Sequence, residues 1–208
     1  MHREDLQGAL LFVIHDFFSP EECRRSIGIS EGMGYADAPI TTALGFVMAK
    51  DVRNNTRVMM DDVAFAGRLF ERARPFLPSR VDFWRLHSLN ERLRYYRYEV
   101  GQRFRLHYDG SFRRNADEES QLTFMVYLND DFTGGTTDFY YENLSLKVSV
   151  KPRQGMALVF AHAQLHEGTP VTSGRKYVLR TDVMYRVLAT GAQERAAEPK
   201  VEDETHAL

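Results

Sequence analysis

The feature that most constrains the fold is a change in the pattern of residue types at Leu93. From there to Val187, short runs rich in Tyr, Phe, Val and Thr are separated by Gly, Asn and Asp, which is typical of antiparallel strands joined by turns. The predicted strands cover 93–100, 104–109, 121–128, 136–141, 145–150, 156–160, 164–171 and 176–187. This half of the chain is therefore expected to be almost entirely β.

Helical signals precede the strands. In the sequence SPEE, Ser19 can cap a helix, Pro20 suits its first position and Glu22 completes a capping box, so we predict a helix that runs toward the glycines near Met33. A second helix is predicted within 61–78, where apolar residues recur at helical spacing before two prolines.

Helices followed by many strands favour a mainly β fold with flanking helices, either a β-sandwich or a jelly roll. The length of 208 residues suits one domain, which we place at 1–190, with a helical support region at about 16–78 and a barrel at about 93–187. Residues 191–208 are polar and lack periodicity, so a disordered tail is predicted there.

Composition narrows the chemistry. A single cysteine, Cys23, excludes an internal disulfide and any multi-cysteine metal site, so a metal would need histidine and carboxylate ligands. The formal net charge of −2 gives no reason to expect nucleic acid as the main partner. The first residues fit neither a secretion signal nor a membrane span, so we expect an intracellular, cytoplasmic protein without a membrane partner.

One histidine and one carboxylate lie two positions apart in RLHYDGSF. In a regular strand His107 and Asp109 would share a face, with Phe104, Leu106 and Tyr108 on the other. An ordinary half-buried strand shows the same alternation. A further histidine, His162 or His166, would complete the two-imidazole, one-carboxylate set of non-haem Fe(II) oxygenases.

Several ordered motifs strengthen the metal hypothesis. They are YEVGQRFRLHYD at 98–109, VYLNDD at 126–131, GGTTDF at 134–139 and HEGTPVTSGRK at 166–176. Together they resemble the 2-oxoglutarate and Fe(II)-dependent oxygenases of the prolyl 4-hydroxylase type over roughly 93–185. The resemblance implies a double-stranded β-helix, another name for the jelly roll. Gly134 and Gly135 are expected in a tight turn that needs positive φ.

The resemblance also implies roles for single residues. His107, Asp109 and His166 would be the iron ligands. Lys176 would receive the far carboxylate of 2-oxoglutarate, and Tyr98 and Tyr127 would hydrogen-bond this cosubstrate. His162 lacks the family's spacing and is interpreted as a pocket or core histidine.

Strand geometry supports a special role for Lys176 independently. In a strand over 176–187, Lys176, Val178 and Arg180 share a face. An unpaired buried ammonium costs several kcal/mol even after relaxation, so the lysine must either reach solvent or meet an anion. Arg175 and Arg180 remain rivals, since Arg180 on the same face could assist or replace Lys176.

The implied activity is a dioxygenase that uses Fe(II), 2-oxoglutarate and O2 and releases succinate and CO2, with ascorbate as a further candidate cofactor. The resemblance favours hydroxylation of a prolyl residue in a peptide or protein. The alternatives are a hydroxylase of a free amino acid or other small metabolite, and a non-catalytic jelly-roll binding module.

Substrate contacts are the least constrained part of the prediction. The stretch VRNNTRVMMDD at 52–62 is either an ordinary connecting loop or a loop that approaches the site, where Asn54, Asn55 or Arg57 could touch substrate. Arginines interleave with aromatic residues over 92–105, as in some single-strand binders, but two faces of consecutive strands explain the pattern better. Nucleic acid is therefore not the expected partner.

Overall fold

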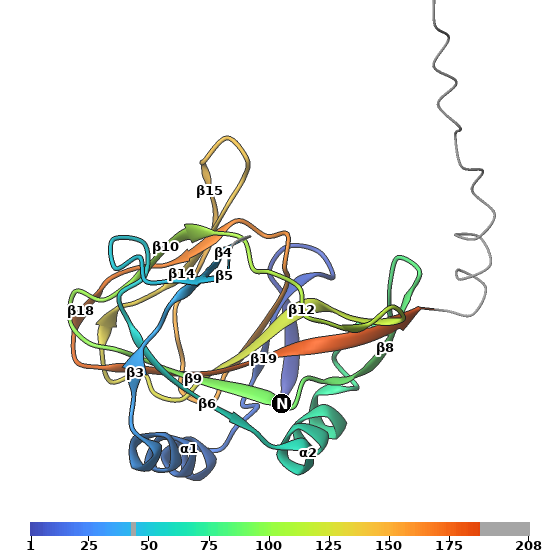
Figure 1. The fold of residues 1–208 in the computed structure, drawn as a ribbon, viewed down its shortest axis with the longest axis horizontal. Coiled ribbons are helices and arrows are strands. Elements are labelled where there is room, and N and C mark those ends of the chain that lie inside the picture. The colour runs from blue at the N-terminus through green and yellow to red at the C-terminus, as the bar shows by residue number, and fades with distance from the viewer. Residues whose placement is uncertain (43–44, 188–208) are drawn as a thin grey trace, which may run out of the picture.

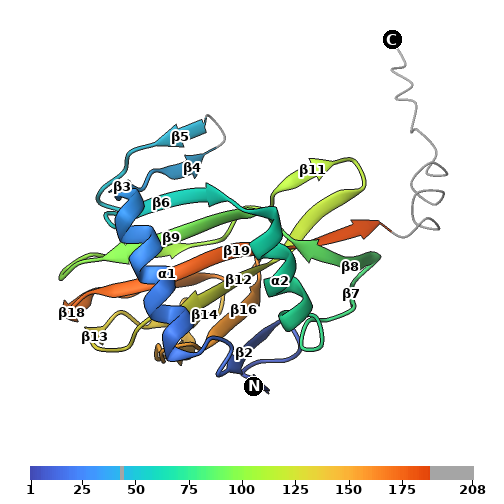
Figure 2. The ribbon, with the colours of Figure 1, turned by 90° about the horizontal axis from the view of Figure 1, so that it is seen from below.

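The computed structural model describes residues 1–42 and 45–187, which form mostly β-strands with helices against one side (Figures 1 and 2). The described helices are α1 (Pro20–Met33) and α2 (Val63–Ala73). Neither has the length and hydropathy that crossing a bilayer requires. The predicted class, mainly β with flanking helices, is confirmed.

A large antiparallel sheet of 11 strands forms the centre of the molecule. Its main path runs in the order β1 (His2–Asp5), β2 (Leu11–His15), β16 (Ala157–Ala161), β12 (Glu118–Tyr127), β19 (Lys176–Val187), β9 (Arg92–Tyr98), β6 (Thr56–Asp61) and β3 (Ala36–Asp37). Beside this path lie β7 (Arg80–Val81), β8 (Trp84–Leu89) and β11 (Arg113–Asn115).

A smaller sheet faces the large one (Figure 1). Its order is β10 (Phe104–His107), β17 (His166–Gly168), β14 (Thr137–Tyr140) and β15 (Leu146–Val150). Two short pairs complete the described strands: β13 (Thr133–Gly134) with β18 (Val171–Ser173), and β4 (Ile40–Thr42) with β5 (Gly45–Val47). Two facing antiparallel sheets are the arrangement expected of a jelly roll.

Alternation along the large sheet creates two apolar layers, because successive side chains point to opposite faces. Leu93, Tyr95 and Leu179 pack with Leu69 of α2 in the layer beneath the helices. Tyr96, Tyr98, Tyr127 and Val178 pack with Phe139 of β14 between the sheets. Figure 2 shows both helices across the outer face of the large sheet, so they brace the sheet from behind.

Both predicted helices are confirmed with their predicted signals. At the start of α1 the Ser19 hydroxyl accepts from the Glu22 backbone N–H at 3.2 Å, and the Glu22 carboxylate accepts from the Ser19 N–H at 2.8 Å. This reciprocal pair satisfies two N–H groups that the first helical turn leaves free. α2 starts after Asp62, whose carboxylate accepts from the Phe65 N–H at 2.8 Å.

The region between the helices differs from the prediction. The support region is not wholly helical, because β6 pairs with β9 along its whole length and extends the large sheet. The predicted loop 52–62 is thus wrong in its second half. β6 is mostly half-buried and carries no clean apolar alternation, so its sequence resembles a loop.

Two further differences concern the strands. The predicted strand 164–171 is split into β17 and β18, because Pro170 between them has no N–H to donate to a ladder. β8 was not predicted, since its sequence WRLHSL mixes polar and apolar residues without a regular period. The predicted tail at 191–208 lies outside the described residues.

Candidate metal centre

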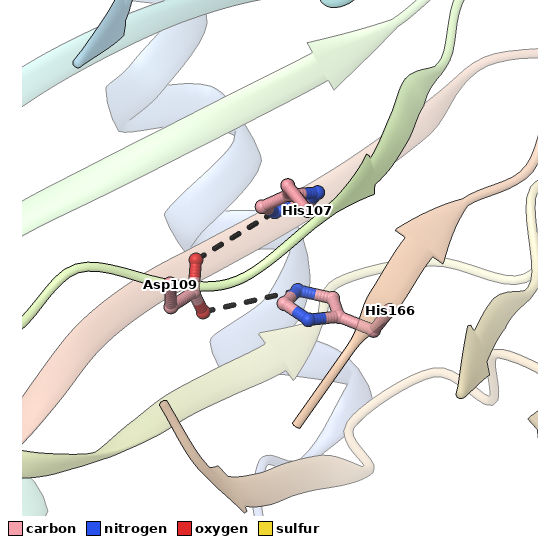
Figure 3. Close-up of side chains that lie close together, drawn as sticks. All are labelled: His107, Asp109 and His166. Carbon is pink, nitrogen blue, oxygen red and sulfur yellow. Dashed lines mark ion pairs between the residues drawn. The ribbon is translucent and has the colours of Figure 1, made fainter. Parts of the chain in front are cut away.

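The three predicted ligand residues converge between the sheets (Figure 3). His107 ends β10 and His166 begins β17, and the antiparallel register places them directly opposite each other. Asp109 follows β10 by two residues. One ligand atom from each lies within 4.8 Å of the other two. The Asp109 carboxylate oxygens Oδ1 and Oδ2 lie 3.7 Å from His107 Nε2 and 3.8 Å from His166 Nε2, respectively.

The strand that carries His107 is not regular. The register of β10 against β17 shifts between Phe104 and His107, and the two rings stack with centroids 3.5 Å apart. The predicted alternation, with Phe104 on the opposite face from His107, is therefore wrong. Leu106 and Tyr108 do point outward, with 37% and 56% of their surface exposed. Phe104 instead forms part of the wall beside the histidine.

Both imidazoles are oriented by a backbone carbonyl two residues earlier in the chain. His107 Nδ1 lies 2.7 Å from the Arg105 carbonyl oxygen, and His166 Nδ1 lies 2.9 Å from the Gln164 carbonyl oxygen. A carbonyl oxygen can only accept, so each Nδ1 must carry a proton, and Nε2 is the nitrogen that is left for a metal. Burial lowers the pKa of His166 to about 4, which favours the neutral ring that a metal requires.

Asp109 is buried and anionic. The Thr123 hydroxyl donates to its Oδ2 at 2.6 Å, and Arg180 Nη2 lies 3.1 Å from its Oδ1. Burial alone would raise the pKa of this carboxyl, but the positive charge of Arg180 holds it well below its usual range. The carboxylate therefore stays charged and oriented toward the two Nε2 atoms.

His162 lies behind the ligands, in agreement with its interpretation as a pocket or core histidine. Its Nε2 lies 2.9 Å from the Ser120 hydroxyl, and its Nδ1 lies 3.1 Å from the Thr123 hydroxyl. Because Thr123 gives its single proton to Asp109, its oxygen must accept from His162. The result is a hydrogen-bonded chain from His162 through Thr123 to Asp109.

Lys176 is buried at the far side of the same cavity, with 3% of its surface exposed. Its Nζ donates to the Gly135 carbonyl at 2.6 Å and lies 5.3 Å from the ring centroids of both Tyr98 and Tyr127. Within the described residues it has no ion-pair partner. Burial lowers the pKa of Lys176 to about 7, and the charge of Asp138 opposes this shift. The lysine does not reach solvent, so it is placed to meet an anion.

The two rival cations have other partners. Arg175 is half exposed, and its Nε lies 2.8 Å from the Glu99 carboxylate. Arg180 shares the face of Lys176, as predicted, but its guanidinium is paired with Asp109 and, at 3.5 Å, with Asp182. Arg180 is thus engaged at the carboxylate of the triad rather than beside Lys176.

The two tyrosines that were predicted to hydrogen-bond the cosubstrate lie beside Lys176. Both Tyr98 and Tyr127 are buried, and the Tyr127 hydroxyl is 2.7 Å from the hydroxyl of Thr137. Burial raises the pKa of both phenols, so both keep their protons. Gly134 and Gly135 have φ of 70° and 63°, which confirms the predicted turn. That turn presents the carbonyl to which Lys176 donates.

Of the three predicted substrate-contact candidates, only Arg57 lines the larger cavity, of about 640 Å³, outside the triad. Asn54 accepts instead from the Arg103 backbone N–H at 2.8 Å, and Asn55 accepts from Arg53 Nε at 2.8 Å. Sequence reasoning missed Thr123 and Arg53. Thr123 has the same strand parity as Tyr127, which could have placed it in the cavity, whereas nothing around Arg53 distinguishes it.

The donor set fits a divalent transition metal. Two imidazole nitrogens and one carboxylate on one side of a cavity form the set that non-haem Fe(II) sites use. The carbonyl partners of both Nδ1 atoms and the Thr123 partner of the carboxylate supply the outer hydrogen bonds that orient metal ligands. His107, Asp109 and His166 are accordingly able to hold such an ion.

Comparison with known proteins agrees with this chemistry. The family model described as the 2OG-Fe(II) oxygenase superfamily matches residues 93–181. Probable prolyl 4-hydroxylase 3 of Arabidopsis thaliana is 27% identical over 195 residues, which cover 80% of this chain and 66% of the relative. Prolyl 4-hydroxylase 1 of the same plant is 27% identical over 193 residues, with the same coverage. The chain thus spans just under two thirds of the length of these relatives.

Solved structures show the same fold. A viral collagen prolyl hydroxylase from Paramecium Bursaria Chlorella virus-1, in a 2OG complex, has a TM-score of 0.60 at 24% identity and covers 87% of this chain and 98% of its own. A Trichoplax adhaerens prolyl hydroxylase has a TM-score of 0.67 at 15% identity, with coverage of 94% and 90%. The predicted double-stranded β-helix is confirmed. Residues 93–181 thus match the 2OG-Fe(II) oxygenase superfamily, and the chain resembles prolyl 4-hydroxylases in sequence and in fold.

Proposed function

We propose that this protein is an Fe(II)- and 2-oxoglutarate-dependent hydroxylase that acts on a prolyl residue of a peptide or protein. The observation that carries the proposal is the pairing, in one cavity, of the His107, Asp109 and His166 cluster with the buried cation of Lys176. A metal cluster alone would suit many reactions. The additional buried lysine, which lacks an anionic partner among the described residues, suits a dicarboxylate cosubstrate.

The residues divide the work. His107, Asp109 and His166 would hold the iron, which together with 2-oxoglutarate and O2 supplies the oxidising power to convert a C–H bond into C–OH, with succinate and CO2 as coproducts. Lys176 would bind the far carboxylate of the cosubstrate. Tyr98 and Tyr127 would lie beside the bound 2-oxoglutarate, hold it in position and exclude water from it.

The substrate class is supported by the relatives. Those reported above are named prolyl 4-hydroxylases, and the Trichoplax adhaerens structure is described as a complex with a peptide fragment of the hypoxia inducible factor oxygen degradation domain. A large cavity of about 640 Å³ opens beside the triad, so a peptide segment has room to approach the metal. A free amino acid is the competing substrate.

Anaerobic binding tests the metal and cosubstrate roles first. Addition of Fe(II) and 2-oxoglutarate to the protein should produce a visible charge-transfer band, and His107→Ala should abolish it. Lys176→Met should retain metal binding but weaken 2-oxoglutarate binding at least tenfold. If wild type shows no band and His107→Ala leaves iron affinity unchanged, a non-catalytic binding module replaces the hydroxylase.

Turnover then tests the substrate. Succinate formation and a mass gain of one oxygen should be measured with proline-containing peptides, free L-proline and other free amino acids, each with and without ascorbate. We expect stimulation and hydroxylation with peptides. Stimulation by free amino acids alone would transfer the proposal to the metabolite class.

A further inference from the structure

We propose that the outer cavity beside the metal site binds a carboxylate of the primary substrate, and that Arg53 is the centre of this receptor. The inference rests on the proposed function and specifies its substrate: the group presented for hydroxylation lies next to an acidic side chain or to a free carboxylate. The argument combines the charge balance of the cavity, the surroundings of Arg53 and its position relative to His107.

The cavity carries a surplus of positive charge. Its wall contains five arginines and two aspartates: Arg53, Arg57, Arg92, Arg94, Arg180, Asp109 and Asp182. Bound Fe(II) and bound 2-oxoglutarate carry opposite charges of equal size, so loading the site does not remove this surplus. A substrate in contact with this wall is expected to bring a negative charge.

Ion pairs already engage three of the arginines. The pairs are Arg92 with Asp61 at 2.9 Å, Arg94 with Asp182 at 3.0 Å and Arg180 with Asp109 at 3.1 Å. These cations are compensated within the protein. The charge that a substrate could balance therefore centres on Arg53, which has no carboxylate partner among the described residues.

Arg53 is a buried guanidinium without a carboxylate partner among the described residues. Only 5% of its surface is exposed, and its Nε donates to the neutral amide oxygen of Asn55 at 2.8 Å. Its Cζ lies 4.5 Å from the ring centroids of both Tyr96 and Phe104, so the group contacts two aromatic faces. Its Nη2 is buried and, within the described part of the chain, has no hydrogen-bond acceptor.

An unsatisfied buried donor of this kind costs free energy that an incoming acceptor would recover. The two ring contacts also hold the Arg53 guanidinium in place before a ligand binds, which reduces the side-chain entropy lost on binding. A carboxylate suits a rigid guanidinium because its two oxygens can accept from two parallel N–H groups.

The pKa shifts of two neighbouring groups agree with a positive local potential. Burial alone would raise the pKa of the Tyr96 phenol, yet Arg53, Arg180 and Arg94 lower it to about 8. Burial lowers the pKa of Arg57, and repulsion from Arg53 adds to this effect. A bound anion would relieve both conflicts at once.

The position of Arg53 links this receptor to the reaction centre. Phe104 stacks on the His107 ring on one side and receives the Arg53 guanidinium over its ring. Phe104 and His107 also line the cavity with Arg53. A carboxylate at Arg53 is thus separated from the metal ligand by one aromatic ring, and the rest of the substrate lies near the metal.

Equilibrium binding tests the proposal without turnover. The protein is loaded with Mn(II) in place of Fe(II) and with saturating 2-oxoglutarate, and Kd is measured by calorimetry. The peptide probes are capped Gly-Asp-Pro-Asp-Gly and capped Gly-Asn-Pro-Asn-Gly, and the small probes are L-proline and L-prolinamide. We expect the carboxylate member of at least one pair to bind at least tenfold more tightly. A difference in Kd between the two peptides would identify the carboxylate as an acidic side chain, and a difference between L-proline and L-prolinamide would identify it as a free carboxylate.

Three variants locate the receptor. Arg53→Gln should reduce the preference for the carboxylate member to twofold or less. Arg57→Gln should reduce it at least threefold and serves as the test should Arg53→Gln not fold. Arg92→Gln is the matched control, because it removes a cation from the same wall that Asp61 already compensates, and the preference should remain above fivefold.

Equal affinity within both pairs for wild type overturns the proposal, as does an unchanged preference in folded Arg53→Gln and in Arg57→Gln. Failure of the proposed hydroxylase is a separate result. In that case no probe supports succinate formation with Fe(II), whether or not the carboxylate preference is present with Mn(II).

Discussion

At the residue scale, the metal site depends on very local hydrogen bonds. Each ligand histidine donates from Nδ1 to the carbonyl of the residue two positions before it, so the neighbouring backbone fixes the orientation of the ring. The carboxylate is held differently, through Thr123 and Arg180 of neighbouring strands in the large sheet. Substitutions elsewhere in the chain are therefore expected to disturb the orientation of Asp109 more than that of either histidine.

Thr123→Val tests this difference. The change preserves the shape of the side chain but removes the hydroxyl that donates to Asp109 and accepts from His162. Loss of such an outer partner typically weakens metal affinity by about 10–100-fold. A Co(II) titration followed by absorbance should show a Kd at least tenfold weaker in Thr123→Val. Thr123→Ser restores the hydroxyl and should bind within about threefold of wild type; equal weakening in both variants would contradict the role of the hydrogen bond.

Lys176→Met tests the cost of the buried ammonium. The pKa of Lys176 is about 7 in the folded protein and 10.5 for an ordinary lysine, so the unfolded chain binds the proton more tightly. The lysine therefore destabilises the fold fully below pH 7, and the penalty disappears as pH rises toward 10.5. Without cosubstrate, Lys176→Met should be more stable than wild type at pH 7.

The difference in unfolding free energy between the two proteins, measured in urea, should shrink by about 1.4 kcal/mol per pH unit between pH 7.5 and 9.5. Other titrating groups are common to both proteins and cancel in this difference. A constant difference across the range would show that Lys176 is not a buried cation. Saturating 2-oxoglutarate should reverse the order at pH 7, because the ligand stabilises wild type.

The residues found from the sequence and those missed differ in how they are encoded. The sequence singled out four residues that line one cavity because they lie within ordered linear motifs: His107, Asp109, His166 and Lys176. Arg53 could not be found in this way, because its importance arises from contact with Tyr96 and Phe104, which are far from it in the chain.

At the scale of elements, the turn after β13 positions the cation. Gly134 has φ of 70°, and a Cβ added there would lie 2.3 Å from the Pro170 carbonyl oxygen. The next residue supplies the carbonyl to which Lys176 donates. The backbone of this turn thus sets both the β13 and β18 pairing and the place of the ammonium.

Gly134→Ala should therefore destabilise the fold and weaken 2-oxoglutarate binding together. The strained φ and the clash are expected to cost about 1–3 kcal/mol, measurable by urea unfolding. Gly67→Ala in α2 is the matched control, since nothing lies within 4 Å of the added Cβ, and helix propensity should make it neutral or stabilising. Retained cosubstrate affinity in a destabilised Gly134→Ala would separate the turn from the lysine.

Strands were predicted well where one face is apolar and turns carry glycine or asparagine. β19 was predicted with its observed bounds, and its alternate residues divide between the two apolar layers as expected. The prediction failed where pairing, rather than side-chain pattern, decides the conformation. β6 is a strand because it pairs with β9 along its whole length. The side chains of β10 do not alternate regularly between the two faces, because the register of β10 against β17 shifts.

At the scale of the whole molecule, the large sheet separates structural support from chemistry. One of its faces packs under α1 and α2, and the other contributes Lys176, Arg180 and Thr123 to the site. Metal binding joins β10 and β17 on the smaller sheet, on the far side from the helices (Figures 1 and 2). Support and site can therefore be perturbed separately.

Thermal unfolding with and without metal tests this separation. At 100 times Kd, Mn(II) should stabilise wild type by about 2.7 kcal/mol, which corresponds to a rise in Tm of roughly 5–10 °C. His166→Ala should lose most of this rise, because it removes one of the three ligands. Leu69→Ala, on the buried face of α2 and 2% exposed, should lower Tm through a cavity cost of about 2–5 kcal/mol yet keep the metal-induced rise. If Leu69→Ala abolished the metal-induced rise in Tm while the protein remained folded, the helical layer would be coupled to the metal site. If the variant unfolds at a lower temperature but keeps the metal-induced rise, metal binding does not depend on the packing beneath the helices.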